Sequence, residues 1–107
     1  MPYGLHEKTI QKICEVFSRF PEIEKAILYG SRAKGNYKPG SDIDITLQGK
    51  KLTSRLCRKI ADMLDDILLP YRIDISYFDD LADPDLYNHI KRVGVIFYAQ
   101  KNYRNAC

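Results

Sequence analysis

The chain has 107 residues, close to the common size of a single domain, and this leaves little room for a second independent core. Apolar residues make up 45% and charged residues 29%, as in ordinary globular proteins, so collagen-like and wholly disordered chains are excluded. The net charge of +3 is too small to indicate a general nucleic-acid binder by itself. We therefore expect one folded domain.

The amino-terminal segment does not resemble a targeting signal. Residues 1–12 carry charges where a signal peptide needs an apolar stretch. No run in the sequence approaches the ~20 apolar residues that a membrane-spanning helix needs. We expect a cytoplasmic protein that does not act at a membrane.

The first half of the chain predicts a helix and two strands. Apolar residues recur at intervals of three and four over 5–20, which is typical of an amphipathic helix, and Pro21 ends it. The short apolar run 25–29 predicts a buried strand that ends at a glycine. A polar turn follows at 30–40, and strict alternation of polar and apolar residues over 41–48 predicts a second strand.

The second half repeats this alternation of helix and strand. Helical spacing over 52–69 ends at Pro70, and alternation over 72–78 predicts a third strand. The remaining segments are an acidic loop at 79–85, a short helix at 84–92, a last strand at 95–98 and a polar tail at 101–107. This order predicts an α/β (α+β) fold over residues 1–100, in which a small mixed sheet of about four strands is backed by helices on one face.

Three aspartates share one face of the predicted sheet. In the strand 41–48, the period of two sends Asp42 and Asp44 to the face opposite the isoleucines. The strand 72–78 repeats the pattern with Asp74, which joins the other two if the strands are neighbours. The Cα atoms of Asp42 and Asp44 should lie about 6.6 Å apart. At this spacing the carboxylates can converge on a pair of divalent ions.

An acidic strand face also has a plainer interpretation, because one Asp-x-Asp pattern is typical of a solvated face. However, Asp has a poor strand propensity, and like charges on adjacent strands repel each other, so three such residues together favour a bound cation. Neither His nor Cys stands among them. Hard oxygen ligands prefer magnesium or manganese to zinc. We therefore expect two Mg²⁺ ions, with Mn²⁺ as the substitute.

A Gly-Ser pair precedes the acidic strand. Gly30 and Ser31 follow the predicted strand 25–29, where a small residue allows a close backbone approach and exposed N–H groups can face a phosphate. The segment is not a Walker motif, because a Lys followed by Ser or Thr is missing. Arg32 and Lys34 are ordinary solvated turn residues if they stand alone. With the carboxylates downstream, their positive charges favour a bound phosphate at this turn.

The sequences GSRAKG at 30–35, SDIDI at 41–45 and RIDI at 72–75 together resemble the minimal nucleotidyltransferases of the polymerase-beta-like superfamily. The resemblance extends over 27–77, about half of the chain. It implies the polymerase-beta-like nucleotidyltransferase fold. It also implies a nucleotide-binding role for Gly30 and Ser31, and a catalytic and metal-binding role for Asp42, Asp44 and Asp74.

The same resemblance implies a reaction and a partner. In this family a metal pair holds the triphosphate of ATP while an acceptor hydroxyl attacks the α-phosphorus, and Asp74 is the candidate to bind the acceptor's metal and take its proton. Members this small resemble antitoxins paired with a helical HEPN-type ribonuclease toxin, and some of them transfer AMP to a tyrosine of that toxin. We therefore expect AMP transfer from ATP to a partner-protein hydroxyl, with tyrosine as the favoured acceptor.

Two alternatives to this function stay open. A catalytically silent antitoxin would keep the fold and block its toxin by contact alone, whereas a small-molecule nucleotidyltransferase would need more surface to grip its acceptor. The eight tyrosines do not alternate with basic residues, so we expect no nucleic-acid binding. His6 and His89 lie far from the aspartates in the sequence and are interpreted as ordinary helix-surface residues.

Overall fold

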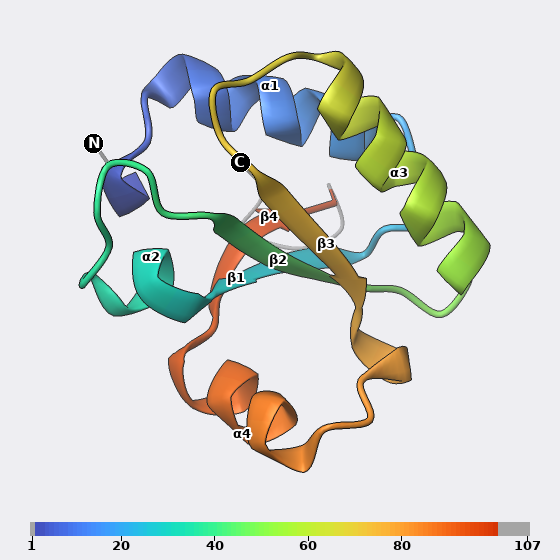
Figure 1. Ribbon diagram of the computed structural model, residues 1–107. Coiled ribbons are helices and arrows are strands. Elements are labelled where there is room, and N and C mark those ends of the chain that lie inside the picture. The colour runs from blue at the N-terminus through green and yellow to red at the C-terminus, as the bar shows by residue number, and fades with distance from the viewer. Residues whose placement is uncertain (1, 101–107) are drawn as a thin grey trace.

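The computed structural model of the chain describes residues 2–100 (Figure 1). The predicted tail at 101–107 lies outside these described residues. The elements are η1 (Pro2–Gly4), α1 (Glu7–Ser18), β1 (Lys25–Tyr29), α2 (Gly30–Lys34), β2 (Ile43–Gln48), α3 (Ser54–Asp66), β3 (Ile73–Tyr77), η2 (Phe78–Asp80), α4 (Pro84–Val93) and β4 (Val95–Ala99). The three long helices and all four strands were predicted from the sequence, with ends that differ by a few residues.

The short helix α2 was not predicted, because the sequence indicated only a polar turn over 30–40. The helix has five residues and is capped by Gly35, which has a φ of 88°. The Gly35 N–H donates to the Ser31 carbonyl at 2.9 Å and closes its single turn. So short a helix contains too few positions for a helical period to show, and its glycines and charged residues are those of a loop.

The sheet has four strands in the order β3-β2-β1-β4. The central strand β1 pairs antiparallel with both β2 and β4, whereas β2 pairs parallel with β3. A parallel pair needs a crossover connection, and α3 provides it between β2 and β3. The sheet is therefore mixed, as the sequence predicted.

The main hydrophobic core lies between one face of the sheet and the helices α1 and α3. Figure 1 shows both helices on the same side of the sheet. Phe17 of α1 and Ile60 of α3 are fully buried there, together with Ile43 and Ile45 of β2. These positions are the apolar ones of the predicted periods, so the sequence pattern and the observed core agree.

The prediction that helices back only one face of the sheet is wrong. The helix α4 lies on the other face (Figure 1), where Ile90 packs in a second, smaller cluster with Tyr29 and Phe78. An amphipathic helix has the same sequence pattern whichever face of a sheet it covers. The sequence therefore identified α4 as a helix but could not place it.

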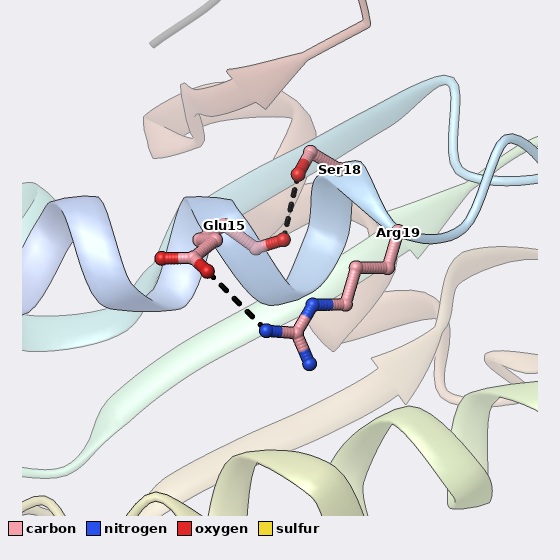
Figure 2. Close-up of polar contacts among 3 residues, drawn as sticks. All are labelled: Glu15, Ser18 and Arg19. Carbon is pink, nitrogen blue, oxygen red and sulfur yellow. Dashed lines mark hydrogen bonds and ion pairs between the residues drawn. The ribbon is translucent and has the colours of Figure 1, made fainter.

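The outer surface of α1 is polar and solvated. Figure 2 shows that Arg19 Nη2 lies 3.2 Å from Glu15 Oε1, and that the Ser18 hydroxyl donates to the Glu15 carbonyl at 2.6 Å. The Arg19 and Glu15 side chains are 57% and 67% exposed, and an ion pair this exposed adds little to stability. Within residues 2–100, no helix has the length and apolar character that crossing a membrane requires.

Ile45 tests the assignment of the core. Ile45→Ala should lower the free energy of unfolding by about 2–5 kcal/mol, because it leaves a cavity at a fully buried position. Urea denaturation measures this change. The exposed Asp62 of α3 provides the control, since Asp62→Ala should change stability by less than about 0.5 kcal/mol. Equal effects of the two substitutions would contradict the assignment.

Candidate active site

Three carboxylates gather where the two parallel strands begin. Asp44 of β2 lies directly opposite Asp74 of β3 in the strand register. Asp42 immediately precedes β2, and its charge and that of Asp74 both act on Asp44. Asp42 and Asp74 are exposed, whereas Asp44 is partly buried. The structure thus brings together the three aspartates that the sequence placed on one face.

This arrangement raises the pKa of the Asp44 carboxyl above its ordinary value of 3.8. Burial is the largest cause, and the negative charges of Asp74 and Asp42 add to it. Holding like charges together opposes folding unless a cation or a proton compensates them. The cluster is therefore a place where a bound cation is favoured.

The chemistry of these ligands fits magnesium or manganese. All three side chains offer hard carboxylate oxygens, which these ions prefer. In the described part of the chain, no three His, Cys, Asp or Glu side chains are arranged so that they could hold a metal ion by themselves. Magnesium is commonly bound by one or two carboxylates together with substrate phosphates and water. The cluster fits an ion of that kind, which takes some of its ligands from the aspartates and the others from a bound nucleotide.

The Gly30-Ser31 turn borders the carboxylate cluster. Gly30 connects β1 to α2 with a φ of 74°, a conformation that favours glycine. A Cβ atom at this position would lie 2.5 Å from Asp44 Oδ2, so a larger residue would collide with the carboxylate. Ser31 follows in α2 and is partly exposed. Glycine thus allows the turn to approach the Asp44 carboxylate closely.

His89 belongs to this site, and its interpretation as an ordinary helix-surface residue is wrong. The Gly30 N–H donates to His89 Nε2 at 3.3 Å. The imidazole also meets the ring of Tyr29 edge-on, with 6.3 Å between the ring centroids. His89 and Gly30 are 59 residues apart in the sequence. No local pattern connects them, and only the packing of α4 on β1 and α2 brings them together.

Tyr29 forms part of the floor of the site, although the sequence indicated only a buried strand residue. It lies opposite Asp44 in the register of β1 and β2 and is 7% exposed. Burial raises the pKa of its phenol, and the charges of Asp74 and Asp44 raise it further. Tyr29 therefore stays protonated beside the carboxylates at physiological pH.

The assignment of Arg32 to phosphate binding disagrees with its position in the structure. Arg32 is only 2% exposed. Its guanidinium donates to the carbonyls of Tyr3 at 2.8 Å, Pro39 at 3.2 Å and Ser41 at 2.9 Å. These bonds use most of its five N–H donors. Arg32 instead fastens the amino-terminal segment and the loop before β2 to α2.

Two aromatic rings complete the surroundings of Arg32. The guanidinium carbon lies 5.3 Å from the ring centroid of Tyr37 and 5.1 Å from that of Tyr71, within the range of a cation–π contact. Lys34, by contrast, is exposed in the last turn of α2. We therefore remove Arg32 from the candidate nucleotide site and keep Lys34.

Comparisons with known proteins point to one family. Residues 11–103 match the family described as "Polymerase beta, Nucleotidyltransferase". The fold is similar to three solved complexes: a toxin-antitoxin with AMP-PNP (22% identity, 92% of this chain and 77% of that chain, TM-score 0.67); the toxin-antitoxin MntA-HepT (18%, 91% and 75%, 0.64); and a tri-AMPylated Shewanella oneidensis HEPN toxin with its MNT antitoxin (18%, 92% and 76%, 0.65). The curated proteins include no match.

The structural role of Arg32 can be separated from the exposed position of Lys34. Arg32→Met should lower the free energy of unfolding by about 3 kcal/mol or more, because several buried carbonyls lose their donors. Lys34→Met should change it by less than about 0.5 kcal/mol. Chemical denaturation measures both. An Arg32→Met protein that is fully stable but has lost nucleotide affinity would restore the original assignment.

Asp44 should make the stability of the metal-free protein depend on pH. Because its pKa is raised in the folded state, the stability that it contributes is complete below pH 3.8 and is lost as the pH rises through the raised pKa. At neutral pH, Asp44→Asn should therefore raise the melting temperature measured in EDTA.

The gain in melting temperature from Asp44→Asn should shrink as the pH falls toward 3.8, where the wild-type carboxyl also becomes neutral. The exposed Asp62 of α3 is the control, and Asp62→Asn should produce no comparable gain. If Asp44→Asn unfolded the protein at neutral pH, Asp44 would be a structural residue.

Proposed function

This chain belongs to the polymerase-beta nucleotidyltransferase family, and on that premise we propose that it transfers AMP from ATP to a hydroxyl of a partner protein. The observation that carries the proposal is the carboxylate cluster at the start of β2 and β3, with Gly30 against Asp44. In the reaction, the acceptor oxygen forms a bond to the α-phosphorus. The bond between the α-phosphorus and the oxygen that bridges it to the β-phosphate breaks. Pyrophosphate leaves, and the hydroxyl proton passes to a base.

Some residues of the proposed site would bind the metal ions, and others would bind the nucleotide. Asp42, Asp44 and Asp74 would hold Mg²⁺, and Mn²⁺ could replace it. When bound, these ions stabilise the charge on the phosphates and make the acceptor hydroxyl more acidic. Gly30 and Ser31 would contact the triphosphate through the turn, and Lys34 would contact its outer phosphates.

Asp74 is our candidate for the base. It is exposed, and β3 is an edge strand of the sheet, so an acceptor that docks from outside reaches this carboxylate. Asp44, by contrast, is partly buried between Asp74 and the Gly30 turn. A base must lie within hydrogen-bond reach of the proton it accepts. Exposure therefore favours Asp74 for this role.

A HEPN-type toxin is the partner that we propose. The similar structures are toxin-antitoxin complexes, one of which contains AMP-PNP and another a tri-AMPylated HEPN toxin with its MNT antitoxin. These descriptions belong to the other proteins, and they support for this chain the role of an antitoxin that modifies a tyrosine of its toxin. Because ATP is a cytoplasmic substrate, we place the reaction in the cytoplasm.

Mass spectrometry of the protein encoded beside this chain's gene, which we expect to be the toxin, tests the proposal. Incubation with the wild-type protein, ATP and Mg²⁺ should add AMP to a toxin tyrosine and release pyrophosphate. Asp42→Asn should slow the transfer by about 10²-fold or more, the scale of a lost electrostatic group in an active site. Asp62→Asn, which alters an exposed residue of α3, should leave the rate unchanged.

Two other results would overturn the proposal. A tight complex without adduct or pyrophosphate, with either metal, would identify a catalytically silent antitoxin. Pyrophosphate release accompanied by AMP on a small molecule, with the toxin unmodified, would identify a small-molecule nucleotidyltransferase.

A further inference from the structure

The Gly30 peptide is held from outside its own turn. Its N–H donates to His89 Nε2 at 3.3 Å. Because a backbone N–H can only donate, Nε2 must present its lone pair, and the neutral ring then carries its proton on Nδ1. The turn that approaches Asp44 thus depends on a side chain from the last helix.

The helix that carries His89 is firmly attached to the sheet. The neighbouring residue, Ile90, is 3% exposed and packs with Tyr29 and Phe78. A Cβ atom at Gly94, where the helix ends, would lie 2.7 Å from a methyl group of Ile27, which shows how closely the chain approaches β1. His89 is therefore presented to Gly30 from a fixed support.

The position of the Gly30 peptide decides the geometry of the site. A Cβ atom on Gly30 would lie 2.5 Å from Asp44 Oδ2, so a small rotation of this peptide changes the distance between turn and carboxylate. It would also redirect Ser31, the next residue, which is partly exposed. A hydrogen bond on the Gly30 N–H limits that rotation.

We propose that His89 is a positioning residue of the nucleotide site. It holds the Gly30-Ser31 turn against Asp44, so that the turn meets the triphosphate in a preformed geometry. This inference rests on the proposed nucleotide site, and it adds to that site a residue of α4. The competing interpretation is that His89 only fills space between α4 and Tyr29, which it meets edge-on.

Three substitutions separate positioning from packing. His89→Leu keeps a side chain of similar bulk but removes the acceptor. His89→Gln places an amide oxygen near the position of Nε2. His89→Asn is polar but too short to reach Gly30. The asparagine variant replaces the leucine variant in the test if the leucine variant does not fold. His6→Leu is the control, because His6 is exposed and its side chain does not cap α1.

Two measurements are made on the full chain, without an acceptor protein. NMR hydrogen exchange reports the protection of the Gly30 amide, and calorimetry reports the affinity for ATP with Mg²⁺. His89→Leu and His89→Asn should speed up exchange at Gly30 and weaken ATP binding by about threefold to tenfold, the scale of one neutral hydrogen bond. His89→Gln should restore both quantities, and His6→Leu should change neither.

Wild-type ATP affinity in His89→Leu or His89→Asn would overturn the proposal, even if their melting temperatures fell, because packing alone would then explain the residue. Failure of His89→Gln to restore binding would also overturn it. If the wild-type chain bound no ATP, the inference and the proposed function would both fail. If it bound ATP but transferred no AMP, only the proposed transfer would fail, and His89 would still be judged by affinity.

Discussion

The candidate site depends on the parallel pairing of β2 with β3, which sets Asp44 opposite Asp74. On the other face of the same strands, Ile43 and Ile45 are fully buried in the main core. Because side chains alternate along a strand, a slip of one residue would carry the isoleucines to solvent and the aspartates into the core. The hydrophobic core thus maintains the register that holds the two carboxylates together against their repulsion.

Arg32, the arginine nearest in sequence to the Gly30 turn, does not relieve that repulsion. It is buried and bonded to backbone carbonyls of the amino-terminal segment and of the loop before β2, and it lies within cation–π range of the rings of Tyr37 and Tyr71. Burial and the negative charges of Asp74 and Asp42 raise the pKa of Asp44. A cation bound with a nucleotide, as proposed for Mg²⁺, would compensate the charges of these carboxylates.

The sequence predicted those features that repeat with a period along the chain. The strand Lys25–Tyr29 has the bounds that were expected for it, and the alternation in β2 and β3 placed the aspartates on one face. The helix α2 was missed because five residues show no period. The roles of Arg32 and His89 were misjudged because each depends on partners that are distant in the sequence, such as Tyr3 and Gly30, and no local pattern records such contacts.

One face of the sheet forms the main core, and the other face carries the candidate site and the helix α4. The helices α1 and α3 cover the core face, so substitutions there act mainly on stability. On the other face, α4 packs over β1 and leaves Asp74 on the edge strand exposed. An acceptor can therefore approach from the side of β3, while α4 holds the Gly30 turn from the side of β1. The nucleotide and its acceptor would meet above β2, where Asp44 lies between them.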